Sequence, residues 1–206
     1  DHTILDGNSA THGVHEARKQ EVMTEGQFRH AVWLSILYKL NIGEPNRMIL
    51  RMLSWLKGTE EHFIMNFSRE IFDLLIKDTV RPEILETMRE HRDKNGAVVL
   101  LSSASTPICL PASQFLGMDD IICTQLESRN GKLTGKTVRK LVYGSEKKVR
   151  MLEFCRDKNF DPRDAWYYGD SHTDRYVMEA VGNPVAVFPD RRLLKIARRN
   201  DWPILQ

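Results

Sequence analysis

The sequence predicts an α/β protein whose second half forms a doubly wound parallel sheet and whose first half is helical. From residue 97 onward, short apolar stretches alternate with segments of helical periodicity, as expected for βαβ units. Between residues 13 and 95, by contrast, the pattern is helical and contains no strand signal. A chain of 206 residues has room for one domain, or for one domain with a large insertion.

Four helices are expected in the first half. Thr24 and Gln27 have the spacing of a capping box, and Thr59 is the expected cap of the third helix. Glycines after the first two helices predict their ends. In chain order we expect helices from Thr24 to Gly43, from Pro45 to Gly58, from Thr59 to Leu74 and from Pro82 to Gly96.

In the second half, the continuous apolar run 97–101 is typical of a strand buried on both faces. Asn130-Gly131 between Leu126 and Leu133 predicts a two-residue hairpin turn. Further strands are expected at 121–123, 165–168 and 184–188, and helices at 107–116, 147–158, 173–181 and 191–199.

Composition excludes several classes of protein. A net charge of +2 is too small to gather a polyanion, so no nucleic-acid partner is expected. No apolar run approaches the ~20 residues of a membrane span. Cys109, Cys123 and Cys155 have neither zinc nor redox spacing, which indicates free thiols in a reducing cytoplasm.

Chemistry is expected where the parallel strands end, because ligands bind there in doubly wound sheets. Gly169, predicted to turn the chain tightly, follows one strand. Asp170 and Asp174 come next, and their carboxylates suit a hard cation such as Mg²⁺. A helix cap followed by a solvated acid would give the same pattern. His172 lies between them as a ligand, a base or neither.

Two further segments point to an anion. Ser102 and Ser103 follow the strand 97–101, and hydroxyls beside a helix start form an anion site or a capping cluster. Lys147 and Lys148 stand at the start of a helix, where the dipole disfavours a cation. Such a lysine reaches for an anion or is simply a surface residue.

Together these segments resemble the motifs of the haloacid dehalogenase superfamily, and more closely its phosphoserine-phosphatase-like branch. The family pattern is Asp-x-Asp-x-Thr, a Ser or Thr, a Lys, and Gly-Asp-x-x-x-Asp. Similarity to that branch extends to residues 131–136, 179–187, 190 and 202–205, and is closest from Gly96 onward. The matching residues are Asp1-x-Thr3, Ser102, Lys148 (or Lys147) and Gly169-Asp170-x-x-x-Asp174.

The resemblance implies a Rossmann-like core formed by residues 1–12 and 91–206, with residues 13–90 inserted as an all-helical cap. Asp1 matches the second aspartate of the first motif. The nucleophilic aspartate is therefore expected two residues before Asp1, with the central strand just before it.

The resemblance also implies a Mg²⁺-dependent phosphatase that forms an aspartyl-phosphate. Asp1 would act as general acid and base, while Thr3 would orient the nucleophile. The metal would be held by Asp1 through its carbonyl and by Asp170, with Asp174 beside them. The phosphoryl oxygens would be bound by Ser102, Ser103 and Lys148.

The substrate implied is a small phosphorylated metabolite. Asn8 stands where phosphoserine phosphatases usually have a Glu that contacts the substrate ammonium, and Ser103-Ala104 replaces their Gly-Gly. These differences put phosphoserine itself in doubt. Contacts from the cap side are expected from Asn8, Ser9, Arg29 and His30.

Alternatives to this hydrolase are a phosphoserine phosphatase proper and a phosphotransferase that passes the phosphoryl group to an alcohol. A catalytically inactive phosphate-binding protein is the alternative of another class. The residue two positions before Asp1 separates it from the enzymes, because only an aspartate there supplies the nucleophile. The sequence leaves the oligomeric state open.

Overall fold

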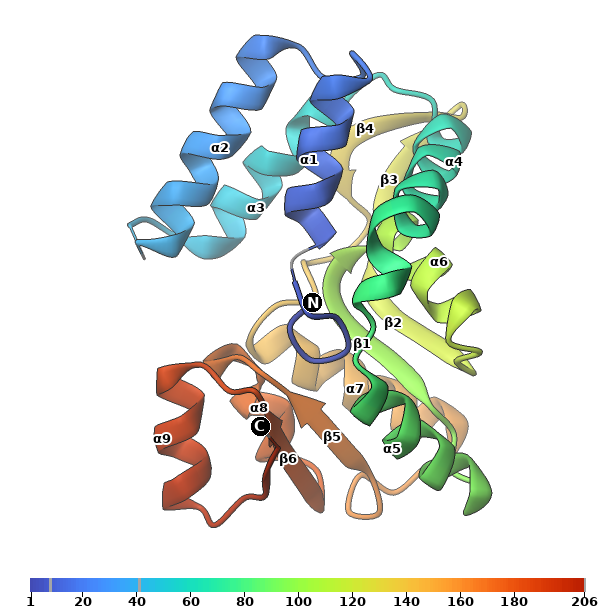
Figure 1. Cartoon of the computed structure of the whole chain (residues 1–206), viewed down its shortest axis with the longest axis vertical. Coiled ribbons are helices and arrows are strands. Elements are labelled where there is room, and N and C mark those ends of the chain that lie inside the picture. The colour runs from blue at the N-terminus through green and yellow to red at the C-terminus, as the bar shows by residue number, and fades with distance from the viewer. Residues whose placement is uncertain (8, 41, 206) are drawn as a thin grey trace.

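The structure is a computed structural model that describes residues 1–7, 9–40 and 42–205. Figure 1 shows a helical region, coloured blue to green, lying over a region of parallel strands and helices. The chain starts between these two regions, close to the end of β1 (Val99–Ser105). Among the described residues, no helix is long and apolar enough to cross a membrane.

The expected helical first half is confirmed. The capping box of Thr24 and Gln27 is present, and the Glu44 carboxylate caps the next helix, which has Pro45 in its first turn. A helix at residues 9–19 was not predicted. The α-helices here are α1 (Ser9–Lys19), α2 (Glu25–Lys39), α3 (Pro45–Leu53), α4 (Glu61–Ile71) and α5 (Pro82–Asp93).

The prediction that Thr59 caps the third helix is wrong. Glu60 is the N-cap of α4 and makes no side-chain cap, while the Thr59 carbonyl accepts a hydrogen bond from the Leu133 amide at 2.9 Å. Thr59 is therefore held against another segment, and Glu60 after it is extended. That long-range pairing determines where α4 begins.

Parallel strand pairing in the second half is also confirmed. β1 pairs with β2 (Asp120–Thr124) in one sheet. A second sheet has the order β5 (Trp166–Gly169), β6 (Asn183–Val187), β7 (Ile204–Leu205). The intervening helices are α6 (Thr106–Phe115), α7 (Ser145–Lys158), α8 (Arg175–Met178) and α9 (Arg191–Arg199).

Three elements differ from expectation. β1 continues to Ser105, four residues beyond the predicted strand end at Leu101. The expected helix 173–181 is a 3₁₀ turn at His172–Asp174 followed by the short α8, because Ser171 and Asp174 form their own capping box. β7 was not predicted.

The predicted hairpin is present as β3 (Leu126–Arg129) and β4 (Lys132–Thr137). Asn130 and Gly131 have φ values of 51° and 74°, as a type I′ turn requires. The hairpin packs against the helical region: Leu133 shares a buried cluster with Leu56 and Ile64. Hydrogen bonds from Gly58 N to Leu133 O (2.8 Å) and from Glu61 N to Gly131 O (2.9 Å) complete the contact.

Packing places α5 with the sheet rather than with the other first-half helices. Ile84 and Met88 of α5 share a buried cluster with Val185 and Val187 of β6. The His91 ring contacts Tyr168 of β5 through a hydrogen bond of 2.8 Å. The boundary expected at residue 90 therefore cuts through a helix that lies on the core.

Gly182, just before β6, is packed too closely for any side chain, and we predict that Gly182→Ala destabilises the fold. An added Cβ would lie 1.7 Å from the Arg163 carbonyl oxygen, so the backbone must shift. The expected loss of unfolding free energy is about 1–3 kcal/mol or more, measured by urea denaturation.

Gly13→Ala is the matched control, because Gly13 lies inside α1 with no atom near the added Cβ. This change should be neutral or stabilise the fold by up to about 1 kcal/mol. Equal unfolding free energies for the two variants would contradict the packing argument.

Candidate active site

The predicted site residues come from four segments that meet at the carboxyl ends of β1 and β5 (Figure 1). Asp170 directly follows β5, and Ser102 lies in β1. Lys147 belongs to the first turn of α7. The first residues of the chain reach the same place, since the Thr3 hydroxyl donates a hydrogen bond of 2.5 Å to Asp170 Oδ1.

Asp170 is a mostly buried carboxylate. Desolvation by burial raises the pKa of its carboxyl group, the Thr3 hydroxyl opposes this, and the negative charge of Asp174 adds to it. The Asp170 carbonyl also accepts a hydrogen bond from Asp190 N at 2.7 Å. A buried carboxylate whose charged form is disfavoured gains from a bound cation.

Asp174 and Lys147 form a buried ion pair at the centre of the site. Lys147 Nζ lies 2.5 Å from Asp174 Oδ1, and their side chains are only 10% and 4% exposed. Asp174 also accepts hydrogen bonds from the Tyr167 hydroxyl at 2.8 Å and from Ser171 N at 3.1 Å. These three donors hold the Asp174 carboxylate in one orientation.

Gly169 serves close packing rather than the tight turn predicted for it. It is the last residue of β5, and a Cβ there would lie 2.9 Å from the Asp174 Cβ. Only glycine lets the Asp174 side chain lie directly on the end of the strand.

The structure places Lys147, and not Lys148, in contact with the acidic residues. Lys148 is partly exposed on α7 and has no ion-pair partner within the described parts of the chain. The two lysines are adjacent and so project in different directions from one helix. Of the two candidates, Lys147 is the one that faces the site.

Asp1 lies beside this network. Its carboxylate Oδ1 accepts a hydrogen bond of 2.9 Å from the backbone N of Ser9, the first residue of α1. Asp1 therefore links the site to the first helix of the overlying region.

Ser102 and Ser103 belong to β1. They therefore do not lie at the helix start where the sequence predicted an anion site or a capping cluster. The strand continues through Ser105, and α6 begins only at Thr106. Ser102 Oγ accepts a hydrogen bond of 3.2 Å from Ala104 N. The Ser103 carbonyl accepts a hydrogen bond from the Thr124 hydroxyl at 3.0 Å.

Of the expected contacts from the cap side, Ser9 reaches Asp1 through its backbone N, whereas Arg29 and His30 are exposed on α2. Asn8 lies outside the described residues. Ser9 is buried at the start of α1. Arg29 is 77% exposed and lies 3.8 Å from Glu25 of its own helix. His30 is exposed and stacks on Trp33.

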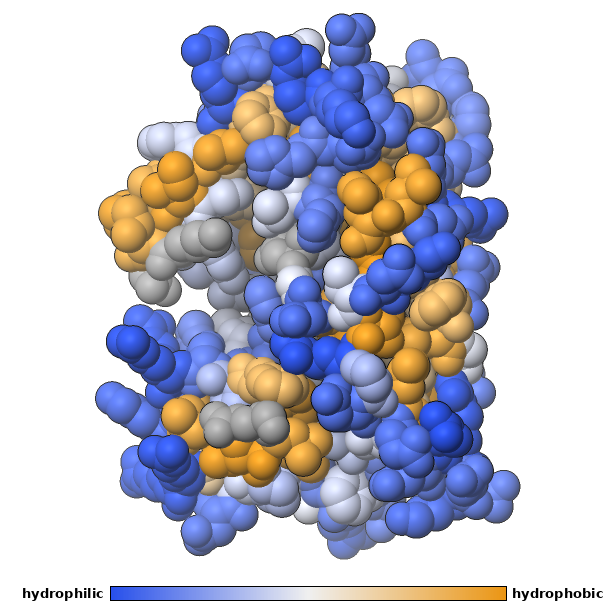
Figure 2. Space-filling model, viewed as in Figure 1, coloured by the Kyte–Doolittle hydropathy of each residue, from blue (hydrophilic) through white to orange (hydrophobic). Residues whose placement is uncertain are grey.

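What α2 presents instead is apolar. Figure 2 shows apolar side chains gathered on this helix, at the edge of a hollow between the upper and lower regions. Trp33 and Ile36 are 52% and 50% exposed. Tyr38 reaches the lower region, where its hydroxyl donates to the Tyr143 hydroxyl at 3.3 Å.

Sequence reasoning missed the role of Tyr167 and of the pair formed by His172 and Asp190. The alternation of β5 could have found Tyr167, because Trp166 and Tyr168 lie on the side of His91 and leave Tyr167 on the opposite face. Asp190 accepts hydrogen bonds from His172 N at 2.8 Å and from Leu193 N at 2.7 Å. Asp190 thus caps α9 and fixes the loop that carries Asp170.

The donor set fits Mg²⁺, which prefers oxygen ligands and is commonly held by one or two carboxylates with waters. The oxygens expected to hold the ion are those of Asp170, of the Asp1 carbonyl and of Asp174, which already accepts hydrogen bonds from three donors. Within the described ranges, no three His, Cys, Asp or Glu side chains cluster as a metal site.

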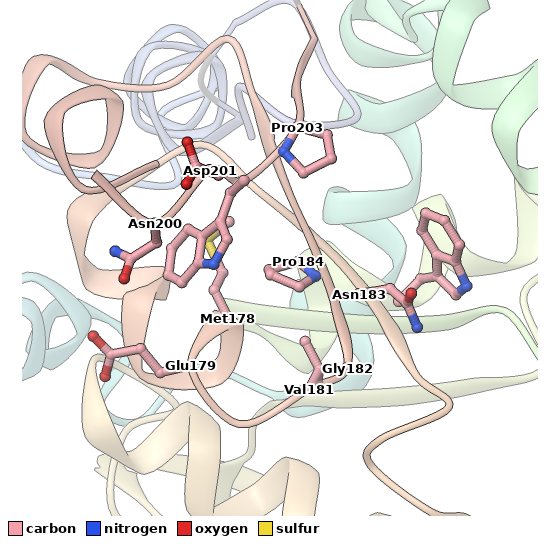
Figure 3. Close-up of a pocket in the computed structure, with 11 residues that line it drawn as sticks. Met178, Glu179, Val181, Gly182, Asn183, Pro184, Asn200, Asp201 and Pro203 are labelled. Atoms are coloured by element: carbon pink, nitrogen blue, oxygen red, sulfur yellow. The ribbon is translucent and has the colours of Figure 1, made fainter. Parts of the chain in front are cut away.

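A cavity of about 520 Å³ lies elsewhere, at the amino ends of β5 and β6. Figure 3 shows its lining, which includes Glu179, Asn183, Asn200 and Asp201. None of the expected site residues lines it. The candidate active site is therefore separate from this cavity and lies at the opposite, carboxyl end of β5.

The ion pair predicts that replacing Lys147 and replacing its neighbour Lys148 affect the stability of the fold very differently. Lys147→Met leaves the buried Asp174 carboxylate without its counter-charge and should lower the unfolding free energy by about 3–5 kcal/mol. Lys148→Met should change it by no more than about 0.5 kcal/mol. Urea denaturation measures both.

A double variant provides the control for this prediction. Lys147→Met combined with Asp174→Asn removes both charges and should recover part of the loss. A double variant whose destabilisation equals the sum for the two single variants would contradict the direct pairing.

Comparison with known proteins agrees with this geometry. The chain is 29% identical over 168 residues to the "Inhibition of morphological differentiation protein" of Streptomyces azureus, covering 79% of this chain and 60% of that protein. It is 23% identical over 209 residues to phosphoserine phosphatase SerB1 of Mycobacterium tuberculosis, covering 99% and 68%. The chain thus spans 60–68% of the length of these two relatives.

Among solved structures, a protein of unknown function from Bordetella pertussis Tohama I is similar with a TM-score of 0.91 and 21% identity, covering 100% of this chain and 95% of that one. This likeness confirms the predicted fold. A family model described as haloacid dehalogenase-like hydrolase matches residues 1–179. The chain therefore belongs to the haloacid dehalogenase-like hydrolase family, as its motifs predicted.

Proposed function

We propose that this chain carries the catalytic site of a Mg²⁺-dependent phosphatase that hydrolyses a small phosphomonoester. The observation that carries the proposal is the buried Lys147–Asp174 pair beside Asp170 and Thr3. A fixed cation next to a buried carboxylate can bind a phosphoryl group and a metal ion together. Family membership and the similarity to a relative named as a phosphatase support the same activity.

In this proposal, Lys147, one of the two lysines that the sequence left open, binds the phosphoryl group. Its ammonium group is held by Asp174 and neutralises phosphoryl oxygens, while Ser102 and Ser103 on β1 donate further hydrogen bonds. Thr3 orients the Asp170 carboxylate. Asp174 positions Lys147.

The nucleophile is an aspartate that we place two residues before Asp1. Its carboxylate attacks phosphorus, the bond from phosphorus to the leaving oxygen breaks, and Asp1 gives that oxygen a proton. Water then attacks the aspartyl-phosphate, Asp1 takes its proton, and phosphate is released. The hydrogen bond from Ser9 N keeps the Asp1 carboxylate in place for both proton transfers.

Asp170 and the Asp1 carbonyl are the groups that would hold Mg²⁺. When bound, the ion offsets the negative charge of the phosphoryl group. Desolvation by burial raises the pKa of Asp170, and the negative charge of Asp174 adds to that rise.

The helical region, residues 13–90 in the expected division, acts in this proposal as a cap that selects the leaving group. Its last helix, α5, is fixed to the core. The elements that select the leaving group are therefore α1–α4 and the hairpin packed against them. The three cysteines, none of them in a disulfide, support a reducing compartment, which we propose is the cytoplasm.

Asp170→Asn should abolish Mg²⁺-dependent release of phosphate from an aryl phosphate, measured on a protein that includes the residues before Asp1. The neutral amide is a poor Mg²⁺ ligand, so the rate should fall by at least ~10²–10³-fold. Asp157→Asn, an exposed carboxylate on α7, is the matched control and should retain activity. Undiminished turnover in the Asp170 variant would refute the metal assignment.

A panel of phosphorylated metabolites tests the substrate class and the reaction type. We expect one group of small phosphomonoesters to be preferred, with one inorganic phosphate released for each ester consumed. Transfer of the phosphoryl group to an added alcohol in place of water would establish the phosphotransferase alternative.

A further inference from the structure

The basic side chains of α9 form an exposed, positively charged face. This helix of nine residues contains five Lys or Arg and neither Asp nor Glu, in a chain with a net charge of only +2. Leu193 and Ala197 are buried against the core, and the basic side chains lie on the exposed side. None of these five forms an ion pair with another residue of the described ranges. The members of this basic face are Arg191, Arg192, Lys195, Arg198 and Arg199.

Such a concentration of charge is unfavourable for the helix alone. Lys195 lies four residues from both Arg191 and Arg199, a spacing at which like charges repel one another on a helix surface. Arg191 and Arg192 also stand in the first turn, where the helix dipole disfavours cations. A negatively charged partner on the basic face of α9 would offset both effects. The basic face therefore indicates an anionic partner.

The outer side of α2 is apolar. Trp33, Ile36 and Leu40 follow one another at intervals of three and four residues, so they share one apolar stripe along the helix. All three are at least half exposed, Leu40 to 62%, and Ile42 just after the helix is 54% exposed. Soluble monomers rarely expose a contiguous group of large apolar side chains except where they bind a partner.

The apolar stripe and the basic face lie on the same side of the molecule. In Figure 1, α2 is at the left edge of the upper region and α9 is at the left edge of the lower region. Figure 2 shows this side as apolar along α2 and hydrophilic along the outer edge of α9, with the hollow between them. One extended partner can therefore contact both features together.

Charge complementarity and apolarity together favour a lipid surface as this partner. An anionic bilayer offers phosphate groups to cations and, just beneath them, acyl chains to apolar side chains. A nucleic acid offers the phosphates but no apolar region that would cover α2. A second copy of this chain offers an apolar stripe, but in a symmetric pair the two basic faces would repel each other.

We propose that the side formed by α2 and α9 docks on the surface of an anionic lipid bilayer. The apolar stripe enters the boundary between headgroups and acyl chains, and the basic face binds the headgroup phosphates. Each Lys or Arg beside such a surface strengthens binding about fivefold. The two features act together, because a basic face alone binds weakly and reversibly in the presence of salt.

Sedimentation with lipid vesicles tests the partner. The full chain should bind vesicles of phosphatidylglycerol mixed with phosphatidylcholine, and should bind vesicles of phosphatidylcholine alone far more weakly. Binding should fall when salt is raised from about 0.1 M to about 1 M, because the Debye length shortens from about 10 Å to about 3 Å. Equal binding to the two kinds of vesicle, or binding to neither, would overturn the proposal.

The basic face is tested by a pair of double variants. Arg192→Gln combined with Lys195→Gln removes two of its cations and should weaken binding to the anionic vesicles about 25-fold. Arg89→Gln combined with Lys94→Gln is the matched control, because it removes two exposed cations from α5 and its C-cap, on the other side of Figure 1. This control should retain nearly all of the binding. Equal losses in the two double variants would contradict a specific role of α9.

The apolar stripe is tested separately. Ile36→Ser should weaken binding to the same vesicles at least ~5-fold, because it removes an apolar side chain from the lipid. Leu74→Ser is the matched control and should bind as the wild type does. Leu74 is 64% exposed in the turn Phe72–Ile76 after α4, across the molecule from α2 in Figure 1. Equal binding by the two variants would contradict the contact of α2.

The fluorescence of Trp33 reports the same contact directly. Brominated lipids in the vesicles should quench the tryptophan emission of the wild type. Trp33→Phe keeps the stripe apolar, so it should still bind but should show much less quenching. Equal quenching in the two proteins would place Trp33 outside the lipid and overturn the proposed orientation.

Two other results would assign this side to a different partner. Binding to a DNA duplex without binding to vesicles would make the basic face a nucleic-acid site. A dimer in ultracentrifugation that Ile36→Ser converts to monomers, again without vesicle binding, would make the apolar stripe an interface between two copies. None of these measurements uses phosphatase activity, so the failure of the proposed function and the failure of this inference are distinguishable.

Discussion

The rest of the site depends on the ion pair between Lys147 and Asp174. It joins α7 to the loop after β5 where both side chains are almost fully withdrawn from water. Burial of two charges is favourable only when each is fully paired. Asp174 achieves this with three donors: Lys147, the Tyr167 hydroxyl and Ser171 N. The loop that carries Asp170 is therefore fixed before any ligand arrives.

This constraint explains several residue types that alone look unremarkable in the sequence. Gly169 has no side chain because Asp174 occupies the space. Tyr167, and not an aliphatic residue, faces Asp174, because the carboxylate needs a hydrogen-bond donor there. Desolvation raises the pKa of the Tyr167 hydroxyl, and the negative charge of Asp174 raises it further. Asp190 fixes the far side of the same loop through His172. Each of these side chains keeps the Asp170 loop in position.

The sequence predicted local features well, since their determinants lie within a few residues. Thr24 with Gln27, Asn130 with Gly131 and the helix 191–199 were each identified in this way. Features set by distant contacts were missed. Lys147 and Lys148 are locally equivalent, and only the packing of α7 against α8 and β1 separates them. In the same way, Thr59 was expected to cap a helix because its pairing with Leu133 is invisible in the local pattern.

The hairpin docked on the helical region has a consequence for energetic coupling. β4 leads directly through residues 138–144 into α7, so one short stretch of chain connects a strand held by Gly58 and Thr59 to the lysine that faces the site. Tyr143, within that stretch, also touches Tyr38 of α2. This stretch therefore gives a direct path along the chain between Lys147 and the upper helices, and a ligand that shifts Lys147 would act on them through it. By reciprocity, whatever binds those helices changes the affinity of the lysine for its ligand by the same factor.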